Sequence, residues 1–228
     1  GDKAERERRS ISFATKGRAV ASNRGDAYFR KQPRKRKTFD KPDFITVARP
    51  DPKRYRCLVV FGLFTHILNL DDAVAEREHH GLPPIEFDWA NCPPNGAETF
   101  PGTYDELFRY DLIVLSDVNY KALGDIPIEM ICDYVQEGGS LLVVGGPYAY
   151  GNGEFEGSRF LDVLPVHLSG PFDLKWAGKG KSWKLQPTKD DHAVLQDISF
   201  DQEPRVFWHH FLTAKKNSMV VLKAGDKP

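Results

Sequence analysis

Side chains capable of acid–base chemistry stand directly after several apolar runs of this 228-residue chain. His66 follows the first run, Asp117 follows a later one, and His209 and His210 come near the end. Imidazole and carboxylate groups are the usual general acids and bases of enzymes. If the apolar runs are parallel strands, their carboxyl ends share one edge of a sheet, where ligands bind. These four residues are therefore the candidate catalytic residues.

Residues beside them offer hydroxyl, amide or backbone groups to a ligand. Glycines matter here because a ligand can approach their backbone closely. The candidate ligand-binding residues are Thr65, Asn119, Gly145, Gly146 and Tyr148. Several candidates also have a structural interpretation, since Asp117 can cap a turn, histidines can be satisfied by backbone groups, and paired glycines can serve backbone geometry.

The sequence predicts no metal site and no cofactor. His66, Asp117 and His209 could supply nitrogen and oxygen ligands, but their spacing follows no metal motif. The three cysteines, Cys57, Cys92 and Cys132, are odd in number and follow no zinc spacing. Cys57 and Cys132 stand on apolar faces, which favours inert core thiols.

From residue 55 onward, strand and helix patterns alternate. Apolar runs predict strands at 56–62, 83–90, 111–117 and 140–144, and apolar spacing predicts helices at 67–80, 103–108, 127–137 and 155–164. Shorter strands are expected at 183–186, 205–208 and 218–223. This alternation is typical of an α/β three-layer sandwich with a mainly parallel sheet. The unbroken run 140–144 predicts a strand that is covered on both faces.

Charge divides the chain unevenly. Residues 1–56 hold 18 Lys and Arg against 7 Asp and Glu, whereas residues 57–228 hold 14 against 25. We therefore expect a basic, largely irregular arm or linker at residues 1–54 and a folded domain at 55–228. The arm could contact the acidic domain of its own or a neighbouring subunit, which would give a homo-oligomer.

Other partners and compartments are less well supported by the sequence. The basic run 30–37 lacks an aromatic platform or a recognition helix, which argues against nucleic-acid binding. No apolar run reaches the roughly 20 residues that span a bilayer, so we expect a soluble protein without a membrane span. The compartment stays open, either cytoplasmic or exported with the signal removed.

Several motifs together resemble one family. They are YDLIVLSD at 110–117, YVQEGGSLLVVGGP at 134–147, YGNGEFEG at 150–157, FLDVLP at 160–165 and DHAVLQDI at 191–198. As a set they resemble the glutamine amidotransferase-like domains of the class I amidotransferase superfamily, and the last is also similar to a segment of trehalose-utilisation-type relatives. The resemblance covers about residues 55–228 and implies a flavodoxin-like fold.

The resemblance also implies a catalytic pattern that this sequence lacks. Active class I amidotransferases carry a Cys on the elbow after a strand, with a His-x-Glu pair later. Here the elbow corresponds to residues 145–148, which contain neither Cys nor Ser, and no Glu stands two residues after His209 or His210. We therefore expect a catalytically degenerate domain, not an enzyme, that serves as a ligand-binding or assembly module of a larger protein. The alternative is a hydrolase or isomerase that acts on a carbohydrate or another small polar metabolite.

The end of the chain carries one further expectation. Residues 218–222 are strand-like and residues 224–228 are turn-like, a pattern that normally leads into another strand. An unpaired edge strand is a liability, so we expect the domain to be truncated before its last strand. Other domains or subunits would then complete the sheet edge.

Overall fold

The computed structural model describes residues 53–62, 72, 77, 79–92, 99–188, 192–196 and 198–225. The predicted arm lies outside these ranges except for Lys53 and Arg54. Most of the helix predicted at 67–80 lies outside them as well. The arm and the domain boundary at residue 55 therefore stay predictions.

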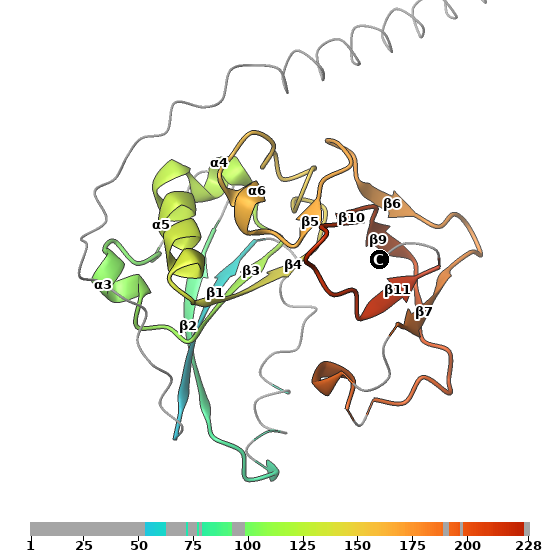
Figure 1. Cartoon of the computed structure of the whole chain (residues 1–228), viewed down its shortest axis with the longest axis horizontal. Coiled ribbons are helices and arrows are strands. Elements are labelled where there is room, and N and C mark those ends of the chain that lie inside the picture. The colour runs from blue at the N-terminus through green and yellow to red at the C-terminus, as the bar shows by residue number, and fades with distance from the viewer. Residues whose placement is uncertain are drawn as a thin grey trace, which may run out of the picture. The chain divides into compact units, whose positions relative to one another are not determined.

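Four parallel strands form the central sheet of the described domain, in the order β2-β1-β3-β4 (Figure 1). The strands are β1 (Tyr55–Phe61), β2 (Ile85–Asn91), β3 (Leu112–Ser116) and β4 (Ser140–Val144). β1 is central, since it pairs with both β2 and β3. This arrangement confirms the predicted α/β, flavodoxin-like fold with a mainly parallel sheet.

The apolar runs of β1 and β3 are unbroken because both faces of these strands are covered. Leu58, Val60 and Ile113 belong to the large core cluster that includes the helices. Cys57, Val59 and Val114 alternate with them and form a smaller cluster on the opposite face. Side chains of a strand point to alternate faces, so an unbroken apolar run is what two buried faces require.

β4 departs from the expectation of burial on both faces. Leu142, in its centre, is 47 % exposed. β4 stands at the edge of the strand order, with β3 on one side only. An edge strand has fewer neighbours to cover its side chains, so the prediction of full burial was wrong here.

The helices include one long element, α5 (Asp125–Gln136), with Pro127 in its first turn as predicted. The end of α5 is set by glycines: Gly138 has φ +96°, its N–H donates to the carbonyl of Val135, and the Gly139 N–H donates to the carbonyl of Tyr134. These two bonds form a Schellman motif, which satisfies carbonyls that the helix leaves unpaired. The predicted glycine stop is confirmed.

The remaining helices are short. They are α3 (Tyr104–Leu107), α4 (Tyr120–Leu123), α6 (Phe160–Val163) and the 3-10 helix η2 (Ala193–Leu195). Thr103 and Glu106 form the predicted capping box at the start of α3. The helix expected at 155–164 reduces to α6, because Gly157 has a positive φ angle of 74°, which a helix does not accept.

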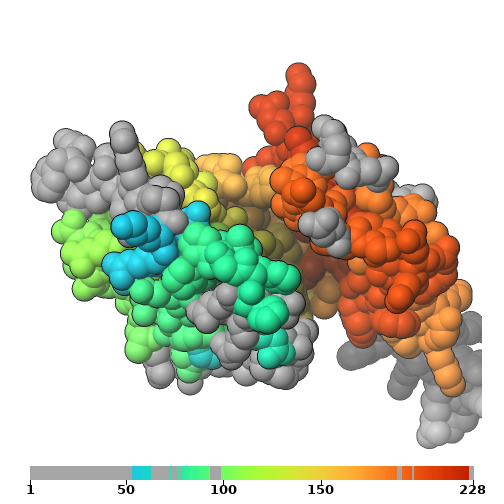
Figure 2. All heavy atoms as spheres, turned by 90° about the horizontal axis from the view of Figure 1, so that it is seen from below, coloured from blue at the N-terminus to red at the C-terminus, as the bar shows by residue number. Residues whose placement is uncertain are grey.

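The later strands form three small antiparallel sheets instead of extending the parallel one. They are β5 (Val166–His167), β6 (Leu174–Trp176), β7 (Trp183–Pro187), β8 (Arg205–Val206), β9 (Trp208–His210), β10 (Thr213–Ala214) and β11 (Leu222–Ala224). β10 pairs with β5, β9 pairs with β6, and β7 lies between β11 and β8. In Figure 2 these strands, in orange and red, gather apart from the blue and green residues of β1 and β2.

Two of the predicted late strands need correction. The strand expected at 205–208 is two strands, because the chain changes its partner at Phe207 from β7 to β6. The strand expected at 218–223 is confined to Leu222–Ala224, where it pairs with β7. No helix within the described residues is long and apolar enough to cross a membrane.

Candidate functional site

The turn after β4 is held between two side chains from distant parts of the chain. A Cβ atom on Gly145 would lie 2.7 Å from Cδ2 of His210, and one on Gly146 would lie 2.3 Å from Oδ1 of Asp117. Both distances are shorter than real Cβ contacts, so each position accepts only glycine without rearrangement. Residues 147–154 then continue as turns, and no helix starts at the elbow.

Asp117 is positioned by the end of β3. It is buried and has φ +51°, a left-handed conformation that Asp tolerates better than most residues. Its Oδ1 accepts a hydrogen bond from the backbone N–H of Tyr148 at 2.7 Å. A Cβ on Gly62 would lie 1.9 Å from the backbone oxygen of Asp117, so the end of β1 also packs tightly against this residue.

His210 approaches the elbow from β9 and is oriented by a buried carboxylate. Its Nδ1 lies 2.8 Å from Oδ1 of Asp173, and its Nε2 accepts a hydrogen bond from the backbone N–H of Gly146 at 3.1 Å. Because Nε2 accepts, the proton of the neutral ring is on Nδ1, where it is donated to Asp173. Both ring nitrogens are therefore engaged within the chain.

Asp173 joins this network to the turn after the elbow. Its side chain is fully buried, and its Oδ2 accepts a hydrogen bond from the backbone N–H of Gly151 at 2.9 Å. The backbone carbonyl of Asp173 accepts a bond from the N–H of Phe211. Asp173 thus connects the turn after the elbow, the start of β6 and the end of β9.

His209 lies beside this pair but makes different contacts. Its Nδ1 lies 3.2 Å from the backbone oxygen of His210, and its ring packs against Trp183 at 4.4 Å and Phe211 at 4.7 Å between centroids. Burial lowers the pKa of His209, and this effect outweighs the hydrogen bond to the backbone oxygen of His210, which raises it. The neutral ring is therefore favoured at neutral pH.

Tyr150 closes the other side of His210. The two rings meet edge to face at 4.8 Å, and the Tyr150 hydroxyl donates to the carbonyl of Val143 at 3.2 Å. Burial raises the pKa of Tyr150 to about 12, with a further contribution from the charge of Asp173. The phenol therefore stays protonated and keeps its bond to β4.

A pocket of about 830 Å³ opens beside the elbow. Such a volume suits a small molecule. Residues of the elbow, of the β6–β9 pair and of the β11-β7-β8 sheet line it, namely Gly145, Gly146, Pro147, Tyr150, Leu174, Leu185, Val206, Trp208, His209, His210, Leu212, Leu222, Lys223 and Ala224. Most of these side chains are apolar.

The structure brings most of the predicted site residues together. Asp117 and His210 meet the glycines of the elbow, and His209 lines the adjacent pocket. Tyr148 takes part through its backbone, and its side chain is 43 % exposed. Asn119 instead caps α4 by accepting a bond from the Ala122 N–H at 2.8 Å.

Thr65 and His66 lie outside the described residues. Asp173 was missed as a functional candidate. The sequence contains no local signal for Asp173, since its partner His210 is 37 residues away. The motif at 150–157 includes Tyr150, but it does not indicate a contact with a histidine on β9.

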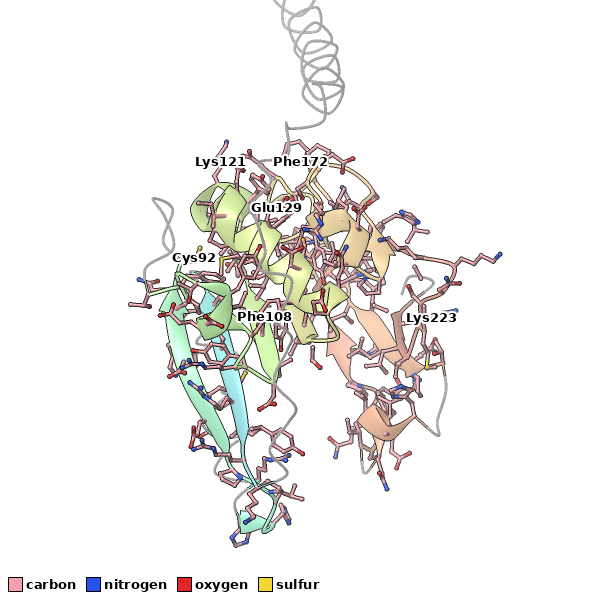
Figure 3. All side chains as sticks on the ribbon, turned by 60° about the vertical axis from the view of Figure 1, so that its left-hand side comes forward. Cys92, Phe108, Lys121, Glu129, Phe172 and Lys223 are labelled. Carbon is pink, nitrogen blue, oxygen red and sulfur yellow. The ribbon has the colours of Figure 1, made fainter. Side chains whose placement is uncertain are left out.

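The three thiols of the chain are unsuited to nucleophilic chemistry. All three are buried, and Figure 3 labels Cys92, which follows β2. Burial raises the pKa of Cys57 and Cys132 to about 12 and that of Cys92 to about 11. The thiolate, which is the reactive form, is thus strongly disfavoured. In the part of the chain that is described, no group of three or more His, Cys, Asp or Glu residues is arranged to hold a metal ion.

The parallel sheet, whose fourth strand ends in a glycine elbow, defines the class of this protein. It is an α/β domain of the flavodoxin-like type. Residues 85–228 match the family described as "Putative glutamine amidotransferase". The match covers more than half of the chain, which therefore belongs to this amidotransferase-like family. The comparison with curated proteins found no match.

Proposed function

We propose that this domain is a catalytically degenerate member of its family and binds a ligand in the pocket beside the elbow. The observation that carries the proposal is the pair of close approaches at Gly145 and Gly146. A nucleophile at either position would need a Cβ where His210 or Asp117 already lies. The space of a catalytic side chain is thus taken by groups that hold the turn.

The surrounding groups support the same interpretation. An amidotransferase thiolate is normally activated by a histidine and a helix N-terminus. Here the turn after β4 leads into further turns, and both nitrogens of His210 are bonded to Asp173 and Gly146. His210 therefore works as a structural link between β9 and the elbow instead of as a base.

The alternative is a hydrolase or isomerase that acts on a small polar metabolite. Its support is the convergence of Asp117 and His210 on the two sides of the elbow. The engaged nitrogens of His210 and the apolar lining of the pocket make binding the better-supported function.

Glutamine hydrolysis provides the test. The purified chain is incubated with glutamine, and ammonia release is compared for the wild type, His210→Ala and the surface control His79→Ala. We expect release at the buffer background for all three proteins. Release well above background that is lost in His210→Ala and retained in His79→Ala would overturn the proposal, provided that circular dichroism shows all three proteins folded.

A further inference from the structure

We propose that the ligand of this pocket is a flat, largely apolar molecule that has an aromatic ring system. This inference rests on the proposed binding function and specifies the chemistry of the ligand. It follows from the two walls of the pocket, from its rim and from the state of its polar groups.

The first wall is one face of the β11-β7-β8 sheet. In an antiparallel pair, directly opposed residues share a face. Ala224 opposes Leu185 and Leu222 opposes Pro187, while Trp183 opposes Val206. Since Trp183, Leu185 and Pro187 alternate along β7, these opposed pairs all lie on the same face. Leu185, Val206, Leu222 and Ala224 from this face line the pocket, so the wall is continuous and apolar.

The second wall is the ribbon of β6 and β9. Leu174 opposes His210, and Trp176 opposes Trp208 two residues further along the ribbon. The two indole rings stack with centroids 6.0 Å apart and an interplanar angle of 22°. Leu174, Trp208 and His210 line the pocket, so the wall runs from the buried elbow out to a stacked tryptophan pair.

The tryptophan pair is open to a ligand. Trp176 is 53 % exposed and Trp208 is 57 % exposed, although large aromatic side chains are usually buried. Aromatic faces bind planar ring systems by offset stacking. The pair therefore offers an entering ring a stacking surface at the edge of an apolar cavity.

The polar side chains of the lining are largely occupied by the chain itself. His210 uses both nitrogens, Tyr150 donates its hydroxyl to Val143, and His209 uses Nδ1 on a backbone oxygen. Among the described residues, the buried Nε2 of His209 has no hydrogen-bond partner, so it is one polar group that the lining can offer to a ligand. A sugar or an amino acid needs several convergent hydrogen-bonding groups, because burying its polar groups without partners is costly. The pocket offers few, which disfavours such ligands.

Lys223 brings an ammonium group to the lining of this pocket. It stands between Leu222 and Ala224 on β11, which belong to the apolar wall. It also borders a second pocket, of about 530 Å³, formed with residues 216–220 and Thr188. Figure 3 labels Lys223 on this part of the molecule.

The experiment is a calorimetric titration of the full chain with 2-naphthol, a neutral and flat probe. Val206→Phe should fill the cavity and weaken binding at least about tenfold, which is a loss of about 1.4 kcal/mol. The matched control Val194→Phe adds the same side chain on η2, where Val194 is 68 % exposed and outside the pocket, and should leave binding unchanged. Circular dichroism and thermal unfolding verify that both variants fold.

Three further titrations define the ligand class. Decahydro-2-naphthol has the same skeleton without aromatic rings and should bind several times more weakly, since ring stacking is lost. Glucose and glutamine in large excess should not compete with 2-naphthol.

Equal binding of 2-naphthol to Val206→Phe and Val194→Phe would overturn the inference, as would equally tight binding of the saturated analogue. If glucose or glutamine binds in a Val206-dependent manner, the ligand class is wrong while the proposed binding function stands. Failure of the proposed function is recognised separately, by ammonia release in the glutaminase assay.

Discussion

Two glycines and three side chains determine what the elbow can do. Gly145 faces His210, Gly146 faces Asp117, and Asp173 holds His210 in place. Each of these contacts joins segments that are far apart in the sequence, so the elbow is fixed from both sides. A rigid turn of this kind suits a binding surface, because a preformed site costs little ordering when a ligand arrives.

Gly146→Ala tests directly how tightly Asp117 packs against the elbow. The new methyl group would lie 2.3 Å from Oδ1 of Asp117, and overpacking of this kind costs about 1–3 kcal/mol. Urea denaturation should show a loss in that range. Gly102→Ala is the matched control, because its nearest neighbour, Oε2 of Glu106, is 3.8 Å away and its stability should change little.

A second substitution tests whether the contact with Asp117 causes the loss of stability in Gly146→Ala. Asp117→Gly removes the clashing carboxylate and suits the positive φ at this position. In the double variant, Gly146→Ala should therefore cost clearly less than it does in the wild-type background. Purely additive effects would contradict the assigned contact between these two residues.

At the scale of elements, α5 depends on its glycine end as well as on its buried face. Ile128, Ile131 and Tyr134 are buried against the sheet, and Phe108, labelled in Figure 3, packs edge to face on the Tyr134 ring. The Tyr134 hydroxyl donates to the carbonyl of Tyr110 at 2.9 Å. The turn from α5 to β4 thus sets where the strand before the elbow begins.

Gly138→Ala and Gly139→Ala should destabilise the domain for different reasons. Alanine at 138 must adopt φ +96°, which costs about 1–2 kcal/mol. Alanine at 139 would place its Cβ 2.3 Å from the Tyr134 ring, so we expect the larger loss there. Thermal unfolding of the two variants beside Gly102→Ala tests this order, and equal losses at 138 and 139 would contradict it.

The sequence predicts the elements with two buried faces or with local signals best. The apolar runs of β1 and β3, the capping box at Thr103 and the glycine stop after α5 all depend on residues within a few positions of one another. β4 was the exception, because an apolar run does not indicate whether its strand lies in the centre or at the edge of a sheet.

The candidate site was predictable only in part. The glycines and the histidines could be identified because they follow predicted strands, whereas Asp173 could not, since a lone Asp in a loop has no periodic pattern. The late strands were misjudged for a similar reason. Their antiparallel partners are chosen by long-range contacts, such as those of β7 with β8 and β11, and not by composition.

At the scale of the whole molecule, buried thiols and phenols make the free energy of unfolding depend on pH in the alkaline range. Burial raises the pKa of Cys57 and Cys132 to about 12, and that of Tyr134 and Tyr150 also to about 12. In the unfolded chain, thiols titrate near 8.5 and phenols near 10. Above about pH 8.5 the unfolded state releases protons that the folded state retains, and the folded state is therefore destabilised as pH rises.

We therefore expect the free energy of unfolding to be nearly independent of these groups below about pH 8.5 and to fall as pH rises toward 12. Urea denaturation over that range measures the slope. Cys132→Ala removes one of the thiols and should make the slope shallower, whereas Cys132→Ala with an unchanged slope would contradict the assignment. The comparison uses slopes, because the variant also loses packing.

The change of partner at Phe207 has a consequence for how the pocket can vary. Val206 belongs to one wall and Trp208 to the other, so a single residue separates the two walls along the chain. The width of the cavity therefore depends on the connection at Phe207. An insertion there would move the two walls apart, whereas substitutions of the side chains that face the cavity would change its shape and leave the strands in place. Ligand preference in this domain should therefore diverge by side-chain replacement and not by changes in loop length.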